Sequence, residues 1–448
     1  MLQRSASSSS SSDRGNTPKV ALRTAPDRAR SGPDQAAIDS RDALHPSQSR
    51  RRSAVQSPLP VALRLALLLP VPVPYREALL ALLAERGRVE PHVLYARSHQ
   101  HRWQQPRAWF PSDHPYPALT LHSFEITWRR RPTPLLLPHG VGRALDAVEP
   151  DCVLSSEFGP LTWAAIAWAR RRGRPWMVLT EVTRASERVL PSWQRRLQRL
   201  IARRAGGVVA VSGQARARLL EAGVAGERVA VVLQPADLAS CARHARVRVP
   251  RDGPLRVVSV GRLVPEKRPD LLLAVAARLG GAVAVTLVGE GPLRGELEAR
   301  ARAQRIGNIT FAGFVAPRDL PRFFADHDVF ALPSSFEPFG AVVREAAACG
   351  MPLVVSDAVG AVGDIAVPDR NAIVVPAGDA EALARALSAL AGDPARVEAL
   401  SRESLAVTAE RSLERDAEEL EAAVARAVYG HRQRRAHRHR AAAARSSG

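Results

Sequence analysis

The residues best suited to chemistry lie in the segment SSFEPFGAVVREAAACG, which spans residues 334–350. Its pattern predicts a short loop containing Glu337 after a strand, followed by a helix that begins around Gly340. The first turn of a helix presents unpaired backbone N–H groups, which together with the helix dipole favour an anion. Gly340 has no side chain, so a phosphate can approach the backbone closely. We therefore expect an anion site at Phe339, Gly340, Ala341 and Val342.

Glu345 follows about one turn into the same predicted helix. Its two carboxylate oxygens can accept hydrogen bonds from a vicinal diol such as a ribose, so the segment favours a nucleotide. A structural alternative stays open. Glutamates near helix starts also interact with the helix dipole, and Glu345 can form a solvated pair near Arg344.

A second cluster of charge lies in VVSVGRLVPEKRPDLLL, where Arg262 and Lys267 follow an apolar strand. Two cations at this edge would suit a diphosphate, and Gly261 allows a ligand to approach the loop. A lone Arg–Lys pair after a strand is usually solvated, but the apolar strand and Gly261 favour a ligand site here. A third loop, LVGEGPLRG, contributes Gly289 as a candidate donor-binding residue, but its glycine spacing fits neither the dinucleotide fingerprint nor a Walker A loop.

Short apolar runs alternate with amphipathic segments from Val61 onward, which is typical of βα units around a parallel sheet. One series runs from VALRLALLLP to GVVAVS, and a second runs from LRVVSVGRL to AIVVPAG. The pattern predicts an α/β protein with two doubly wound halves, joined near residues 236–254. Ligands of such sheets lie beyond the carboxyl ends of the strands, so we expect one cleft between the halves.

Length and charge agree with this organisation. A chain of 448 residues exceeds one ordinary core. Residues 1–60 contain ten Lys or Arg against five Asp, and residues 431–448 contain six Arg and no acid, so eleven of the twenty net positive charges lie at the ends. Basic ends can attract any polyanion. No nucleic-acid-binding motif accompanies them, so we expect no specific nucleic-acid partner.

Cysteine usage and hydropathy bear on the compartment. Cys152, Cys241 and Cys349 are far apart and form no CxxC pattern, which indicates neither a disulfide framework nor a zinc site and suits a reducing cytoplasm. No apolar run reaches the roughly 18 residues that a membrane span needs. We expect a cytoplasmic protein, with the inner face of the membrane as an alternative location.

In their order and spacing, SVGRLVPEKRPDLLL, LVGEGP, ITFAGFV, DVFALPSSFEPFGAVVREAAACGMPLVVSD and VGAVGDI resemble the family 4 retaining glycosyltransferases of the GT-B fold. The resemblance is close over about residues 255–390. It implies two Rossmann-like domains, at 59–240 for the acceptor and 254–411 for the donor, and a helix at 412–430 that crosses back to the first domain. Residues 1–58 and 431–448 are expected to be disordered.

The resemblance also implies roles for the residues. Arg262 and Lys267 would neutralise the donor diphosphate as the glycosidic bond breaks, and Glu337 would face the donor sugar. Glu345 would hold the ribose hydroxyls, and the nucleobase would rest near Phe314 and Val315. The implied reaction is sugar transfer from a nucleotide-sugar donor to a carbohydrate or lipid-linked hydroxyl, with retention of configuration and neither a metal nor a cofactor.

Departures from the family pattern concentrate in the first half. PVPVPYREALL, with prolines at 70, 72 and 74, stands where relatives often have a Gly-rich loop, and Glu181 stands where they often have a histidine. LQPADL keeps Asp237 but lacks an Asn-Gly pair. Asp364 replaces a common glutamate.

The helix predicted at 193–204 combines an apolar face with arginines, so peripheral contact with an anionic membrane is one interpretation and core packing is the favoured one. Two alternatives to a transferase also stay open. Another GT-B enzyme, such as a sugar-nucleotide epimerase or a phosphorylase-like protein, would need no transfer to an acceptor hydroxyl. An inactive scaffold would bind nucleotide without turnover, as Glu181 and the missing Gly-rich loop suggest.

Overall fold

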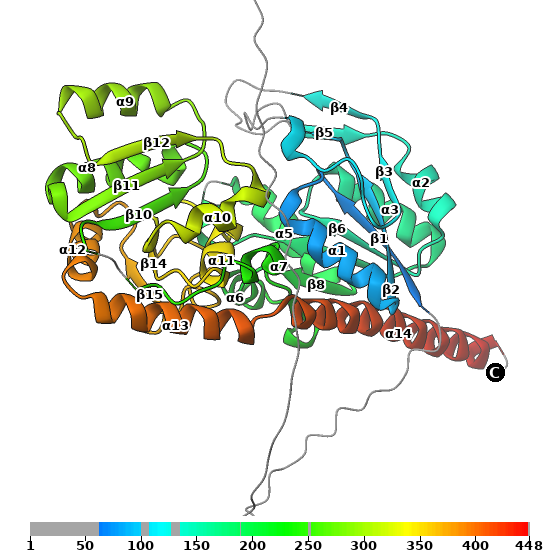
Figure 1. Ribbon diagram of the computed structural model, residues 1–448. Coiled ribbons are helices and arrows are strands. Elements are labelled where there is room, and N and C mark those ends of the chain that lie inside the picture. The colour runs from blue at the N-terminus through cyan, green and yellow to red at the C-terminus, as the bar shows by residue number, and fades with distance from the viewer. Residues whose placement is uncertain (1–61, 100–106, 127–134, 189, 250–251, 447–448) are drawn as a thin grey trace, which may run out of the picture. The chain divides into compact units, whose positions relative to one another are not determined.

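The computed structural model describes residues 62–99, 107–126, 135–188, 190–249 and 252–446, all within one compact unit that begins at Pro58. The expected disordered segment 1–58 lies outside these residues. Two parallel sheets dominate the unit (Figure 1), and we call their surroundings the first and the second domain. The two doubly wound α/β halves expected from the sequence are therefore confirmed.

The first domain contains a seven-stranded sheet in the order β3-β2-β1-β6-β7-β8-β9, with every neighbouring pair parallel. Its strands are β1 (Leu63–Leu69), β2 (Val89–Tyr95), β3 (Ala118–Thr120), β6 (Cys152–Ser156), β7 (Trp176–Thr180), β8 (Gly207–Ala210) and β9 (Val229–Val231). A separate antiparallel pair consists of β4 (Ser123–Ile126) and β5 (Leu135–Pro138). The buried strands β1, β7 and β8 are mostly apolar, as expected for a sheet covered on both faces.

The second domain contains a six-stranded parallel sheet in the order β12-β11-β10-β13-β14-β15. Its strands are β10 (Leu255–Val260), β11 (Val283–Val288), β12 (Ile309–Gly313), β13 (Val329–Leu332), β14 (Leu353–Ser356) and β15 (Ala372–Val375). The order reverses between β10 and β13, which puts the loops after these two strands beside each other. In open sheets this switch point is where ligands bind.

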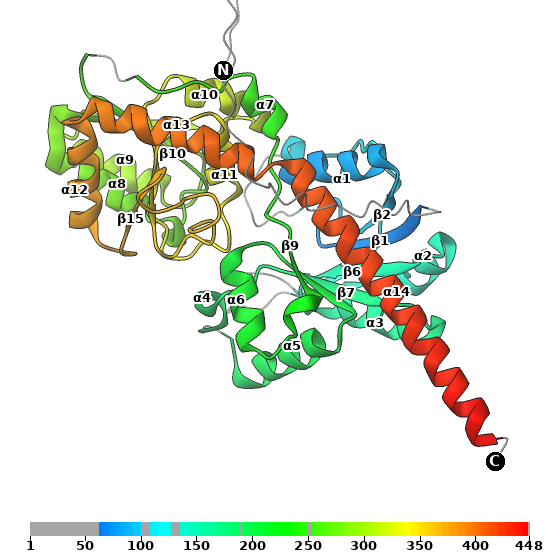
Figure 2. The same ribbon diagram turned by 90° about the horizontal axis from the view of Figure 1, so that it is seen from below.

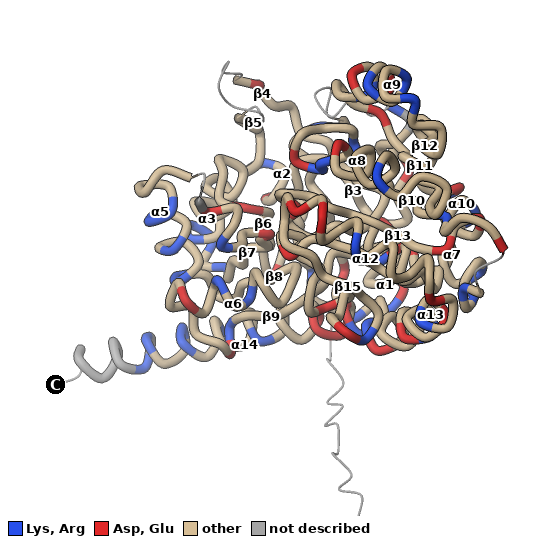
Figure 3. The backbone as a smooth tube through the Cα atoms, turned by 90° about the vertical axis from the view of Figure 1, so that its left-hand side faces the viewer, with Lys and Arg blue, Asp and Glu red and all other residues tan. Residues whose placement is uncertain are grey.

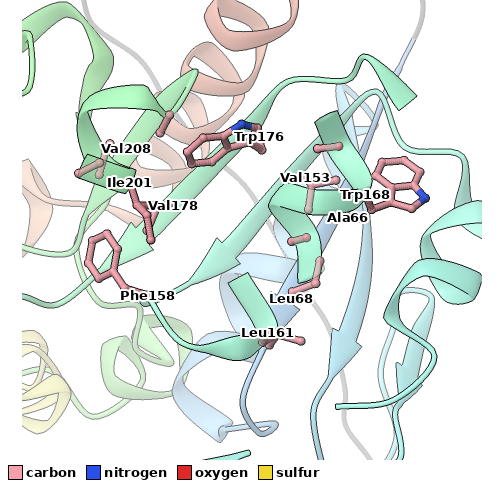
Figure 4. Close-up of a cluster of buried hydrophobic side chains, with 14 of the residues drawn as sticks. Ala66, Leu68, Val153, Phe158, Leu161, Trp168, Trp176, Val178, Ile201 and Val208 are labelled. Atoms are coloured by element: carbon pink, nitrogen blue, oxygen red, sulfur yellow. The ribbon is translucent and has the colours of Figure 1, made fainter. Parts of the chain in front are cut away.

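Helices cover both sheets. In the first domain they are α1 (Pro74–Arg86), α2 (Val141–Val148), α3 (Pro160–Arg172), α4 (Arg184–Arg188), α5 (Ser192–Arg204) and α6 (Gly213–Glu221). In the second they are α8 (Pro269–Leu279), α9 (Arg294–Ala303), α10 (Leu320–Ala325), α11 (Ala341–Ala348), α12 (Ala380–Ala391) and α13 (Pro394–Glu410). Figure 4 shows part of the first-domain core, where Phe158, Trp168 and Trp176 pack with aliphatic side chains of the strands.

Two elements link the domains. α7 (Leu238–Ala242) follows β9, and its Cys241 packs in the core around β13 and α11. α14 (Leu413–Ser446) follows α13 and packs Leu420, Val424 and Val428 against the first-domain sheet (Figure 2). The crossing helix matches the resemblance.

The end of α14 differs from the expectation for residues 431–448, because the helix continues to Ser446 instead of giving way to a disordered tail at 431. The segment is rich in Arg and Ala, which have high helix propensity, and it extends a helix already packed on the protein, so no new nucleation is needed.

Candidate functional site

The start of α11 has the geometry expected of an anion site. Gly340 precedes the helix with φ of 90°, in the left-handed region that favours glycine. No side chain caps this helix end, so the first-turn N–H groups have no side-chain acceptor within the described residues. Gly360 lies against the loop so closely that an added Cβ would meet the Pro338 carbonyl oxygen at 1.9 Å, which fixes the loop that carries Glu337. The helix N-terminus is therefore open to an anionic ligand.

The loop after β10 brings its two cations to the same place. Lys267 forms an ion pair with Glu337. The loops also share backbone hydrogen bonds, since Ser335 N–H donates to the carbonyl of Glu266 at 2.8 Å. No hydrogen-bond or ion-pair partner contacts the Arg262 side chain within the described part of the chain. Its guanidinium is thus available for a ligand anion, and Lys267 is held by a carboxylate that a phosphate could replace.

Burial shifts the titration of these cations. It lowers the pKa of Lys267 to about 7, and the Arg262 guanidinium acts in the same direction. The Glu266 carboxylate opposes this shift in pKa, and the Glu337 carboxylate in contact with Lys267 also favours the ammonium form. Burial also lowers the pKa of Arg262 from its ordinary value, with Glu266 opposing it. Two cations crowded in one partly buried place gain stability when a dianion arrives, so the site is suited to a diphosphate.

Gly289 packs against the backbone of the loop that carries Arg262. It does not belong to the residues that line the cleft described next, although we expected it to bind the donor. An added Cβ on Gly289 would lie 2.0 Å from the carbonyl oxygen of Gly261, and one on Gly291 would lie 2.3 Å from that of Leu263. These glycines therefore let the β11 loop pack against the loop that carries Arg262. Their role in the structure is close backbone packing.

A cleft of about 350 Å³ joins these groups to the first domain. Its second-domain wall comprises Arg262, Lys267, Glu337 and residues 339–342, together with Glu345. Its first-domain wall comprises Pro74, Tyr75, Trp109, Glu181 and Gln234. The structure thus brings together seven of the candidate residues from the loops after β10 and β13, plus Glu345 from one turn further along α11.

An adjoining pocket of about 370 Å³ shares Glu345, Tyr75 and Trp109 with the cleft and continues to Phe314. Phe314 is 36% exposed, so its ring can stack on a ligand. Val315 does not line either cavity and instead packs against the second-domain core. The two cavities together have the polarity of a nucleotide: cations at one end, a carboxylate in the middle and an aromatic ring at the other.

Glu345 lies at the junction of the two cavities. Burial raises the pKa of this carboxyl to about 7, and Asp237 contributes in the same direction. Arg344 does not pair with it. That side chain is fully buried, forms an ion pair with Asp416 at 2.6 Å and donates to the carbonyl of Gln234. The solvated-pair alternative for Glu345 is therefore wrong, since its neighbour in sequence faces the opposite way.

The first-domain wall has a charged group of its own. Glu181 follows β7 and accepts from the Arg76 guanidinium at 3.1 Å. Behind it, Glu157 follows β6 and accepts the backbone N–H of Glu181 at 2.8 Å. Burial raises the pKa of Glu157 to about 7, and Glu181 adds to the shift. Glu181 therefore lies on the cleft wall opposite the cations, and Arg76 and Glu157 hold it in place.

The domains also contact each other directly at Asp364. Its carboxylate accepts the backbone N–H of Gly213 at 2.6 Å, at the N-terminus of α6. A carboxylate at a helix start is favoured by the helix dipole. The shorter side chain in place of a common glutamate thus still reaches an acceptor position. Within the described residues, no group of three or more His, Cys, Asp or Glu is placed to hold a metal ion.

Comparison with known proteins decides the family. The model for "Glycosyltransferase Family 4" matches residues 76–240, and that for "Glycosyl transferases group 1" matches residues 243–406. A GDP-mannose-dependent alpha-mannosyltransferase of Mycobacterium tuberculosis is 32% identical over 273 residues, which are 56% of this chain and 68% of that protein. The chain belongs to the family 4 glycosyltransferases. It is an enzyme that transfers a sugar from a nucleotide-sugar donor.

One further relative and one solved structure resemble this glycosyltransferase. A D-inositol 3-phosphate glycosyltransferase of Kribbella flavida is 34% identical over 185 residues, 38% of this chain and 42% of that protein. The crystal structure of Anabaena HepE in complex with UDP has a TM-score of 0.62 at 19% identity, and the match covers 80% of this chain and 98% of that one. The structural likeness shows the GT-B fold.

Several cleft residues of this glycosyltransferase carried no motif. Tyr75 and Trp109 come from separate first-domain segments, and Gln234 lies in LQPADL, where only the departure from the family pattern marked the place. The one signal for Tyr75 was its position directly after the three prolines that follow β1. A loop after a strand is where ligand-contacting residues are expected, but its residue types alone did not indicate contact.

Proposed function

We propose that this glycosyltransferase moves a hexosyl group from a nucleoside diphosphate sugar to an acceptor hydroxyl with retention of anomeric configuration. The observation that carries the proposal is the convergence of Arg262, Lys267 and the open start of α11 on one cleft wall. As the bond between the anomeric carbon and the phosphate oxygen breaks, negative charge grows on the diphosphate. Donors already aimed at that charge lower the barrier without reorganisation.

The remaining residues would position the donor. Glu345 would accept hydrogen bonds from the ribose hydroxyls, and Phe314 would lie beside the base. Glu337 would face the sugar hydroxyls once a phosphate takes over its contact with Lys267. The acceptor oxygen would attack the anomeric carbon from the face that the diphosphate leaves, and its proton would pass to the departing phosphate oxygen. No cofactor or metal is needed for this step, because the two cations supply the charge.

A nucleotide screen tests the proposal first. Thermal shift with UDP, GDP and ADP should show stabilisation by at least one, since a ligand that binds only the folded state raises the melting temperature. GDP-mannose is the first donor to assay, because the Mycobacterium tuberculosis relative is named for it. The glycosyltransferase should release nucleoside diphosphate in the presence of an acceptor, and a product with the anomeric configuration of the donor should form.

Two variants separate the site from the fold. Glu345→Ala should abolish nucleotide stabilisation and turnover. Glu381→Ala, which removes an exposed glutamate on α12 far from the cleft lining, should change neither. Wild-type turnover by Glu345→Ala would refute the assignment of the site. Nucleotide binding without turnover of any donor would favour the scaffold alternative, and a changed sugar without an acceptor would favour an epimerase.

We further propose that the acceptor is a carbohydrate or a lipid-linked carbohydrate. We also propose that α5 contacts the anionic inner face of the cytoplasmic membrane. On this helix Leu200 is 45% exposed beside exposed Arg196 and Arg199, whereas Ile201 packs in the core. Basic residues also recur along α14 before its last, grey turns (Figure 3). Sedimentation with phosphatidylglycerol vesicles, lost at high salt, is the expected result. Among the described helices, none is long and apolar enough to cross a membrane.

A further inference from the structure

A separate pocket of about 690 Å³ lies in the first domain, between α5 and the loop that joins β6 to α3. None of the candidate donor residues lines it. Phe158 forms its floor, and Figure 4 shows this ring at the start of the loop, with Leu161 further along. The volume falls within the ~300–1,000 Å³ typical of small-molecule sites. The pocket is therefore large enough for a ligand of two or more sugar rings.

Two indole rings border this pocket. Trp163 on α3 is 46% exposed and Trp193 on α5 is 60% exposed. Exposed apolar surface that borders a pocket is typical of a binding site, and large aromatic side chains contribute most of that surface. The flat face of an indole can cover the C–H face of a sugar ring and leave the ring hydroxyls free for hydrogen bonds. Two such faces on different elements suit a ligand made of rings.

Polar groups complete the lining. Gln194 and Gln198 lie one turn apart on α5, and both line the pocket. Gln198 is only 8% exposed, and its side-chain oxygen has no hydrogen-bond partner within the described residues, as is also true of Gln194. Buried amides are normally paired, so an unpaired one beside a pocket points to a ligand with hydrogen-bonding groups. Sugar hydroxyls can pair with these amides, whereas an acyl chain cannot.

One hydrogen bond connects the walls of the pocket and the donor cleft. Glu157 lines the pocket, and it accepts the N–H of Glu181, which lines the cleft. Glu157 has φ of 62°, a left-handed conformation that is uncommon for a residue with a side chain. Such conformations persist where the surrounding structure enforces them, often at functional sites. A ligand in the pocket would therefore lie one hydrogen-bonded pair, Glu157 and Glu181, away from the donor cleft.

We propose that this pocket binds the non-reacting rings of a carbohydrate acceptor, with Trp163 and Trp193 as stacking surfaces and Gln194 and Gln198 as hydrogen-bonding partners. The inference rests on the proposed function, because it assigns the acceptor of the same reaction. It names a substrate class, an oligosaccharide or the glycan part of a glycolipid. On this proposal, Trp193, Gln194 and Gln198 of α5 bind sugar, whereas the exposed Leu200 and arginines of the same helix do not.

Calorimetric titration of the full-length protein with maltose and with α-mannobiose tests the inference, in the presence of saturating GDP or UDP. At least one disaccharide should bind saturably. Trp163→Ala and Trp193→Ala should each weaken that binding at least tenfold, and Trp193→Phe should restore part of it. Leu200→Ala is the matched control, since Leu200 is exposed on the same helix but does not line the pocket. It should bind the disaccharide as the wild type does.

Nucleotide affinity, measured in parallel, separates this inference from the proposed function. If the wild type binds neither GDP nor UDP, the proposed function is contradicted. Intact nucleotide binding without saturable binding of either disaccharide would overturn the carbohydrate assignment. Binding of phosphatidylglycerol vesicles that is lost in both tryptophan variants, without any disaccharide binding, would also overturn it in favour of a lipid chain. Equal disaccharide affinity in the wild type and the tryptophan variants would place the sugar elsewhere.

Discussion

The two domains of this glycosyltransferase share one architecture but contribute to the cleft in different ways. The second domain supplies Arg262, Lys267 and the start of α11 from two loops that follow adjacent strands. The first domain supplies Tyr75, Trp109 and Glu181 from three distant segments. A helix end and two cations can be encoded by short motifs, whereas the first-domain wall depends on the assembled domain.

The largest effect is expected where the two domains hold the start of α11 between them. Asp416 on α14 pairs with the buried Arg344 and accepts the N–H of Leu233. Asp416→Ala leaves a buried guanidinium without its counterion, and removal of one partner of a buried pair costs about 3–5 kcal/mol. Arg344 retains the carbonyls of Gln234 and Arg411, so we expect about 3 kcal/mol. Urea denaturation measures the loss of unfolding free energy.

A surface pair is the control for Asp416. Arg278 and Glu381 are both more than half exposed, and exposed pairs contribute about 0–1 kcal/mol. Glu381→Ala should therefore change the unfolding free energy little. An equal, small effect of both variants would mean that the second domain does not depend on α14, and the contrast between local and assembled sites would weaken.

The next effect tests the local character of the donor site. Lys267→Ala removes one of two cations aimed at the leaving diphosphate, and removal of one such donor typically costs about 10²–10³ in kcat. The unfolding free energy should fall less than with Asp416→Ala, because the Glu337 carboxylate that loses its partner lines the cleft, where water can reach it, whereas Arg344 is fully buried. Steady-state kinetics measure kcat. Arg278→Ala, on the exposed face of α8, is the control.

The sequence predicted most of the second domain and little of the first-domain wall of the cleft. The strand pattern from LRVVSV to AIVV predicted all six strands of the second sheet, because buried parallel strands are continuous apolar runs. Glu337, Arg262 and Glu345 were found because each follows a strand or begins a helix. Val315 was misplaced, since one residue along the chain reverses the direction of a side chain. Tyr75 and Trp109 reach the cleft only through tertiary packing, which no local pattern encodes.

A smaller effect on binding is expected when Glu345 loses only its charge and keeps its shape. Its pKa is raised to about 7 by burial, so the carboxyl is ionised above that pH and protonated below it. Hydrogen bonds from ribose hydroxyls are stronger to the ionised form. Nucleotide affinity should therefore fall as the pH drops from 8 to 6. Glu345→Gln should bind about tenfold more weakly at pH 8, as the loss of one charged acceptor implies, and with a flatter pH profile. Calorimetry at three pH values measures the nucleotide affinity of both proteins. If the affinity of Glu345→Gln varies with pH as that of the wild type does, the Glu345 carboxyl is not the titrating group.

The smallest effect concerns Glu157, where the first domain carries its own perturbed carboxyl. Its pKa is raised to about 7 in the folded chain against an ordinary 4.5, so the folded state holds the proton more tightly than the unfolded state. The unfolding free energy should therefore fall as the pH rises from about 4.5 to about 7 and then level off. Because the carboxyl lines an open pocket, we expect a fall of only about 1 kcal/mol. Glu157→Gln should lack this component, whereas Glu381→Gln should retain it. Denaturation curves at pH 5, 6, 7 and 8 measure the difference. Parallel pH profiles of the unfolding free energy for wild type and Glu157→Gln would show that the pKa of Glu157 is not raised by folding.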